Sequence, residues 1–285
     1  MPKRFDIAML ALAIIFPPAS SYFHELYCHC ESSDELLEKV LKDKTYDLPP
    51  FIRERSENFR MQYAYELADY CYQNGIDIIS LGSEDFPYQL AEISCPPIVI
   101  FCKGKIPAEK GISIVGARKA DSYSLKVAEH FSAEFAKQGI SVISGFANGI
   151  DTAAHKAAIE NGGKTVAVLG CGIDFDYPHG KEELKEIISA NGAVISEFPP
   201  ISPPKPEYFK IRNRMISALS EAVLVIQASR HSGALNTVSH ALEQGKDIFV
   251  IPPRDIFSSA YAGQILLLKD GAQAAYSPKD ILLSI

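Results

Sequence analysis

The feature that most constrains the fold is a repeated alternation of short apolar segments and amphipathic segments from residue 111 onward. The apolar segments predict strands over residues 112–115, 141–144, 165–169, 193–196, 222–227 and 248–251. The segments between them have apolar residues at helical spacing and predict helices over residues 122–138, 152–160, 181–190, 208–219 and 235–244. Apolar strands joined by helices are typical of a mostly parallel sheet with helices on both faces. The sequence therefore predicts a doubly wound α/β fold.

The first part of the chain has a different pattern. Apolar residues recur at spacings of three and four over residues 34–42 and 58–74, which predicts helices, and short strands are expected at 76–81 and 97–101. A chain of 285 residues is long enough for two domains. We therefore expect a small helical domain over residues 1–75 and an α/β domain over residues 76–285.

The start of the chain combines basic residues with an apolar run at 7–16, as a secretory signal peptide does. Asp6 interrupts the basic region, and the run serves equally well as the buried first helix of the helical domain. No later segment reaches the ~18 apolar residues that a membrane span requires. We therefore expect a cytoplasmic protein without a membrane span.

The six cysteines are scattered and have no zinc-finger spacing, so we expect reduced thiols and no bound metal. The turns after the strands match neither the dinucleotide fingerprint G-x-G-x-x-G nor the P-loop pattern. A lone Gly-x-Gly at 170–172 is weak support for a nucleotide. No cofactor is therefore expected.

The net charge of −7 argues against a protein that coats nucleic acid with its whole surface, so any such site must be a local basic patch. In a doubly wound sheet the ligand crevice lies at the carboxyl ends of the strands. The loop after the first strand places Arg118 and Lys119 ahead of a helix N-terminus, which favours an anion. In the loop at 144–151 two glycines permit close backbone approach, and Asp151 is expected to cap the next helix.

The segment 197–214 carries four cations and three aromatic residues, namely Lys205, Lys210, Arg212, Arg214, Phe198, Tyr208 and Phe209. Cations beside aromatic rings suit single-stranded nucleic acid, because phosphates pair with the cations and bases stack on the rings. A proline-stiffened loop whose aromatic residues pack onto the sheet explains the same residues. The loop at 229–237 is small and polar and could hold a phosphate, with His231 as an ordinary loop histidine.

Several motifs together resemble one known family. They are residues 115–118 (VGAR), 143–145 (ISG), 149–155 (GIDTAAH), 166–172 (VAVLGCG), 177–178 (YP), 196–200 (SEFPP), 209–214 (FKIRNR) and 232–234 (SGA). In order and spacing they resemble the DprA (Smf) family of DNA-processing proteins. The resemblance runs from about residue 76 to residue 285.

This resemblance implies a Rossmann-like domain that binds single-stranded DNA, forms a homodimer, loads the RecA recombinase during natural transformation and is not an enzyme. It also implies that the helical part corresponds to a domain similar to the sterile alpha motif. Arg118 and Lys205 would hold phosphates, Phe209 would stack a base, and glycine amides would take further phosphate oxygens. The expected DNA-contacting residues are Arg118, Lys119, Ser144, Gly145, Lys205, Phe209, Arg212, Asn213, Arg214, Ser232 and Gly233. Two positions depart from the family pattern, since Asn148 stands where Arg is common and Pro253 where Gly is common.

Two other functions stay open. A nucleotide-hydrolysing enzyme of the lysine-decarboxylase-like family has a similar sheet, but its glycine-rich motif ending in a catalytic Glu is absent from the corresponding segment 232–240. An interaction protein that has lost DNA affinity is the other alternative, favoured by the acidic balance and Asn148. Release of a free base from a nucleoside monophosphate would support the first, and retained DNA affinity would exclude the second.

Overall fold

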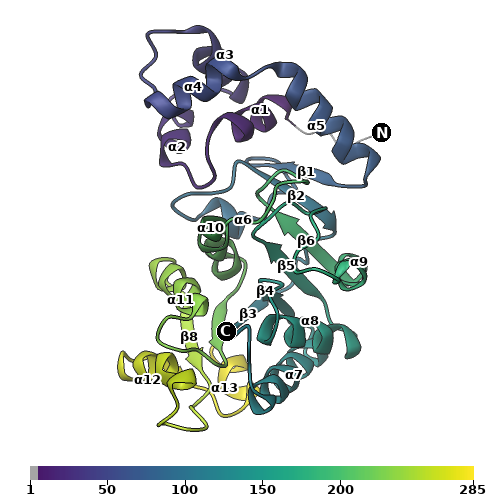
Figure 1. Cartoon of the computed structure of the whole chain (residues 1–285), viewed down its shortest axis with the longest axis vertical. Coiled ribbons are helices and arrows are strands. Elements are labelled where there is room, and N and C mark those ends of the chain that lie inside the picture. The colour runs from purple at the N-terminus through teal and green to yellow at the C-terminus, as the bar shows by residue number, and fades with distance from the viewer. Residues whose placement is uncertain (1–5) are drawn as a thin grey trace.

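The computed structural model describes residues 6–285 and has a helical part at one end and a sheet-containing part at the other (Figure 1). The basic residues considered above as the start of a signal peptide lie outside this range. The helical part contains α1 (Ile7–Ile15), α2 (Ser21–Tyr27), α3 (Ser33–Lys42), α4 (Pro50–Asn58) and α5 (Met61–Gln73).

Helix α1 begins at a capping carboxylate. Asp6 Oδ1 accepts hydrogen bonds from the backbone N–H groups of Ala8 and Met9, at 2.9 and 3.1 Å, which pairs donors that the first turn leaves free. Its other oxygen accepts a hydrogen bond from Ser33 at the start of α3. Most of α1 is buried, as expected for the first helix of a helical domain. No helix among residues 6–285 is both long and apolar enough to cross a membrane.

The described residues form a sheet with strand order β1-β2-β6-β5-β4-β3-β7-β8-β9. Pairing is antiparallel between β1 and β2 and between β2 and β6, and parallel elsewhere. The strands are β1 (Asp77–Ser80), β2 (Val99–Gly104), β3 (Gly111–Val115), β4 (Ser141–Ser144), β5 (Thr165–Leu169), β6 (Gly192–Ser196), β7 (Ala222–Val225), β8 (Asp247–Val250) and β9 (Gln273–Ala274). The expected doubly wound, mostly parallel fold is confirmed.

Helices cover both faces of this sheet, with α7, α8 and α9 on one side and α10 and α11 on the other (Figure 1). Alternate strand residues enter different cores, as the period of two requires. Val142 of β4 packs in the core beneath α7 and α8, whereas its neighbour Ile143 packs in the core beneath α10 and α11. The helices of this part are α6 (Tyr88–Ala91), α7 (Ser122–Lys137), α8 (Ile150–Glu160), α9 (Glu182–Asn191), α10 (Pro206–Ala218), α11 (Gly233–Glu243), α12 (Ala262–Lys269) and α13 (Pro278–Leu282).

The helical part shares a core with the sheet. Buried residues of α1, such as Leu12, belong to the same apolar cluster as Val99 and Phe101 of β2 and Leu169 of β5. The cluster therefore crosses the proposed domain division at residue 75.

Helix α10 begins earlier than the sequence pattern suggested. We expected residues 197–207 to be loop, but α10 starts at Pro206, which occupies the first helical turn. Proline is favoured there because its missing N–H would be unpaired anyway, so Pro206 was the available signal. As a consequence, residues 209–214 lie on a helix and point in different directions.

Candidate nucleic-acid interface

A cavity of about 910 Å³ opens at the carboxyl ends of the central strands. Strands β3 and β7 are neighbours in the sheet, but the chain runs from β3 to β4 on one side and returns to β7 on the other. The first residues after both strands line the cavity, among them Arg118 after β3 and Ser229 after β7. The cavity therefore lies at the topological switch point, where doubly wound sheets bind ligands.

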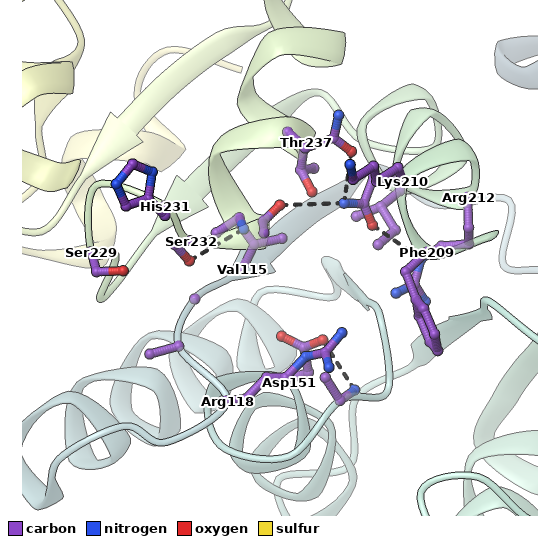
Figure 2. A pocket seen from close by; sticks show the side chains of 18 of the residues that line it. Val115, Arg118, Asp151, Phe209, Lys210, Arg212, Ser229, His231, Ser232 and Thr237 are labelled. Atoms are coloured by element: carbon purple, nitrogen blue, oxygen red, sulfur yellow. Dashed lines mark hydrogen bonds between the residues drawn. The ribbon is translucent and has the colours of Figure 1, made fainter. Parts of the chain in front are cut away.

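Four exposed cations line this cavity, namely Arg118, Lys119, Lys205 and Lys210. They come from the loop after β3 and from the beginning of α10 (Figure 2). The N-termini of α10 and α11 also lie at the cavity wall and add partial positive charge. The single carboxylate in the wall, Asp151, is 7% exposed, so the accessible surface is basic although the whole chain is acidic.

Phe209 is the aromatic residue of segment 197–214 that lines the cavity. The guanidinium of Arg118 lies over its ring, 5.3 Å from the centroid. The other two aromatic residues pack together instead, because the buried ring of Phe198 stacks on Tyr208 at 4.0 Å. One ring of this segment therefore faces the cavity and two pack against each other.

Arg212 is 5% exposed and serves the interior of the site. Its guanidinium donates to the carbonyl of Gly145 at 2.8 Å and to that of Val168, and thus ties the loop after β4 to β5. Burial lowers the pKa of this arginine to about 10, and burial raises the pKa of the nearby Asp151 against the influence of Arg212. Arg212, expected among the DNA-contacting residues, does line the cavity, but its guanidinium is bound to backbone carbonyls and holds the framework of the site.

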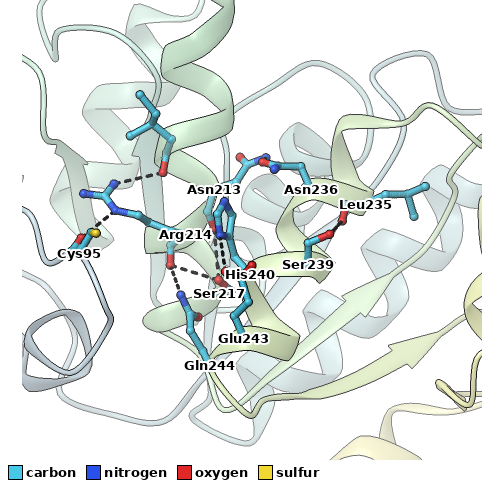
Figure 3. Close-up of polar contacts among 11 residues, drawn as sticks. Cys95, Asn213, Arg214, Ser217, Leu235, Asn236, Ser239, His240, Glu243 and Gln244 are labelled. Atoms are coloured by element: carbon cyan, nitrogen blue, oxygen red, sulfur yellow. Dashed lines mark hydrogen bonds and ion pairs between the residues drawn. The ribbon is translucent and has the colours of Figure 1, made fainter. Parts of the chain in front are cut away.

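Arg214 lies outside the cavity. Its guanidinium forms a buried ion pair with Glu197 at 2.7 Å. It also donates to the carbonyl of Cys95 at 2.9 Å (Figure 3). The helical period turns this side chain away from Phe209, so its expected place in the DNA pocket is corrected.

Ser144 and Gly145 also differ from expectation. Both are buried, and the Ser144 hydroxyl donates to the carbonyl of Ile114 at 2.6 Å. A Cβ on Gly145 would lie 2.9 Å from Asp151 Oδ2 and 2.8 Å from Arg212 Nη2. The space beside Gly145, where we expected phosphate oxygens, is thus occupied by the side chains of Asp151 and Arg212. Asp151 itself lies within α8 and accepts from Ala147 N–H, whereas Gly149 occupies the cap position.

Asn213, Ser232 and Gly233 all line the cavity. The Asn213 amide donates to the carbonyl of Gly233 and to Asn236 Oδ1, at 3.3 and 3.1 Å, and so joins α10 to α11. The Ser232 hydroxyl caps α11. Gly233 is exposed, which leaves the beginning of α11 accessible.

The structure adds residues that sequence reasoning did not select. Lys210, Tyr177, His231 and Asn236 line the cavity. Lys210 belongs to the basic segment 197–214 and Tyr177 to the motif 177–178, so the sequence could have indicated both as site residues. Asn236 carried none, because its approach to Asn213 depends on how α10 and α11 pack.

Several known proteins are similar to this chain in sequence. A family model described as DNA recombination-mediator protein A matches residues 77–285. The DNA processing protein DprA of Bacillus subtilis is 36% identical over 233 residues, which cover 81% of this chain and 78% of the relative.

Two solved structures are also similar. The X-ray structure of DprA from Streptococcus pneumoniae matches with a TM-score of 0.85 and 29% identity, over 99% of this chain and 98% of that one. A structure that describes the single-stranded DNA binding mode of DNA processing protein A from Helicobacter pylori matches with a TM-score of 0.64 and 28% identity, over 71% and 93% of the two chains. Since the family model spans most of the sequence and the fold agrees over nearly its whole length, this chain belongs to the DprA (Smf) family of DNA recombination mediators.

Proposed function

We propose that this protein binds single-stranded DNA in the switch-point cavity. Arg118, Lys119, Lys205 and Lys210 pair with phosphates, and Phe209 stacks a base. The observation that carries the proposal is the gathering of four exposed cations around the aromatic ring of Phe209 in a chain of net charge −7. The structure of the Helicobacter pylori relative, which concerns its single-stranded DNA binding mode, supports it.

The test is fluorescence anisotropy with a labelled oligothymidine strand and a matching duplex at several salt concentrations. We expect the protein to prefer the single strand and to bind it less tightly as salt rises. Each cation that pairs with a phosphate releases counterions, and for a single strand it adds about 0.7 to the slope by which log K falls with log salt concentration. Arg118→Ala and Lys205→Ala should each lower the slope by roughly that amount, and Lys44→Ala, an exposed lysine of the helical part, should leave it unchanged. Unchanged affinity in both cavity variants would show that DNA binds elsewhere, and absence of binding by the wild type would overturn the proposal.

We further propose that the protein acts as a homodimer in the cytoplasm, where it protects incoming single strands and loads RecA for homologous recombination. Membership of a recombination-mediator family supports this role. The test is RecA filament formation on a strand already covered by single-strand-binding protein. We expect the wild type to accelerate filament formation and Lys205→Ala not to do so. Equal acceleration by both proteins would show that RecA loading does not depend on the cavity.

A further inference from the structure

The loop after β3 continues past the switch-point cavity onto neighbouring surface. Its residues Arg118 and Lys119 line the cavity, and α7 begins shortly after them, at Ser122. Proteins that bind single strands without sequence preference follow the backbone along a groove over several nucleotides. A strand that is held by Arg118 and Lys119 therefore has to leave the cavity over surface of this kind.

The beginning of α7 is fixed against the cavity wall by one carboxylate. Asp121, the N-cap residue of α7, accepts hydrogen bonds from the Gln227 amide at 3.1 Å and from the Tyr261 hydroxyl. Gln227 lines the cavity itself, and Tyr261 directly follows Ala260, another lining residue. The first turn of α7 therefore lies next to the cavity wall.

An aromatic ring and a cation meet on this first turn. Tyr123 is 40% exposed, and the central guanidinium carbon of Arg254 lies 5.6 Å from the centre of its ring. Arg254 belongs to the loop after β8, and β8 pairs in parallel with β7, whose following loop lines the cavity. Because parallel strands end at the same edge of a sheet, the Tyr123–Arg254 pair and the cavity share that edge.

The positive charge of Arg254 is available to a ligand. Arg254 is exposed, and none of the salt bridges among residues 6–285 involves it. Two carboxylates lie nearby, but Asp255 accepts the backbone N–H of Phe257 at 2.9 Å, and Asp121 accepts from the groups named above. A guanidinium that stacks on a ring keeps its N–H groups in its own plane, where they can reach a phosphate.

We propose that Arg254 binds a phosphate of the strand after the strand has left the switch-point cavity past Lys119. Arg254 makes the contact, and Tyr123 is a positioning residue that restricts where the guanidinium lies. This inference rests on the proposed binding of single-stranded DNA in the cavity. It extends the site to the loop after β8 and makes the contribution of Arg254 depend on the length of the strand.

The experiment measures the Kd of labelled oligothymidine strands from about 4 to about 16 nucleotides long, a range of sizes seen in other single-strand sites. Arg254→Ala should bind the shortest strands as tightly as the wild type, because these occupy only the cavity. It should bind the longest strands about two- to fivefold more weakly at low salt, as expected for one exposed ion pair. For these strands the salt slope should fall by about 0.7. Arg60→Ala, at an exposed arginine of the helical part, is the matched control and should resemble the wild type at every length.

Two further variants test the role of the ring. Arg254→Lys keeps the positive charge but loses the planar group that stacks on Tyr123. It should keep the wild-type salt slope and bind long strands about twofold more weakly, the loss expected from an exposed cation–π contact. Tyr123→Leu should have the same two effects. Tyr72→Leu, at a tyrosine that is 70% exposed, is its control and should have neither.

The outcomes separate this inference from the proposed function. A wild-type Kd for Arg254→Ala at every strand length overturns the extension and leaves the proposed function intact. An equal loss at all lengths, the shortest included, also overturns it, because Arg254 would then act on the cavity itself. Absence of binding by the wild type to strands of any length overturns the proposed function and the extension together.

Discussion

His155 is a fully buried histidine of α8. Its Nδ1 lies 2.7 Å from Thr165 Oγ1, and that hydroxyl donates to the carbonyl of Val142, so Nδ1 must carry the proton and donate. Nε2 has no hydrogen-bond partner. Burial, with the nearby Lys181 and Arg212, lowers the pKa of His155 to about 3.

This shift makes stability depend on pH. Below about pH 6.5 the unfolded chain binds a proton that folded His155 does not take up until about pH 3, so the free energy of unfolding falls as pH falls through that window. The slope contributed approaches about 1.4 kcal/mol per pH unit. Denaturant titrations between pH 7.5 and 5 should show that His155→Gln loses this contribution, whereas His29→Gln, at an exposed histidine, retains it. Equal slopes for His155→Gln and the wild type would contradict the assignment.

The individual cations show where sequence reasoning stopped. The segment 197–214 was identified as rich in cations, and its Lys205 and Lys210 do line the cavity. Arg212 and Arg214 turn inward because buried acceptors, the carbonyl of Gly145 and the carboxylate of Glu197, lie within reach only after the strands assemble. Spacing along the chain predicts cations but not their partners.

Among the elements, the beginning of α8 couples two functional loops. Gly149 has φ of 79°, a left-handed conformation that glycine tolerates. A Cβ there would lie 2.3 Å from the carbonyl oxygen of Ala117, next to Arg118. The loop after β4 thus packs directly against the loop that carries Arg118.

Gly149→Ala should therefore weaken DNA binding as well as stability. Gly139→Ala is the matched control, since Gly139 has φ of 72° but no atom within 4 Å of the added Cβ. Gly139→Ala should lose about 1–2 kcal/mol because of its positive φ. Gly149→Ala should lose more, because its ψ of −124° lies outside the left-handed helical region and because the added Cβ clashes. Thermal melts and oligothymidine titrations should show reduced affinity for Gly149→Ala alone; retained affinity would mean that the two loops are not coupled.

The sequence predicted helices and strands correctly where the apolar pattern of a segment matches the way that segment packs in the fold. Strands β3 to β8 were found within a few residues because each is apolar on both faces of a covered sheet. The segments α12, α13 and β9 were not predicted, because they are short and their order depends on contacts such as Gln264, whose amide donates to carbonyls of Ile226 and Ile251.

At the scale of the whole molecule, the helical part and the sheet are joined by one apolar core. Phe16 is 1% exposed at the end of α1 and belongs to the cluster that includes β2. Polar links reinforce the junction, since the Tyr70 hydroxyl of α5 donates to Asp174 at 3.0 Å. We expect the two parts to unfold together.

Phe16→Ala should destabilise the whole protein by about 3–5 kcal/mol, the usual range for a buried phenylalanine. Far-ultraviolet circular dichroism and tyrosine fluorescence should report one coincident transition, shifted as a unit. Tyr72→Ala, at a tyrosine that is 70% exposed, should stay within about 0.5 kcal/mol of the wild type. Two separate transitions, of which only one moves, would show that the helical part unfolds by itself.

The sheet ends on short strands at both sides, the four residues of β1 and the two residues of β9. Unpaired edges are where sheets of different molecules join and start to aggregate, and short edges offer few free backbone groups for this. Copies of this protein that met edge to edge would gain little hydrogen bonding. We therefore expect any specific assembly to use side-chain surfaces, because these would leave the sheet unable to extend from one molecule to the next.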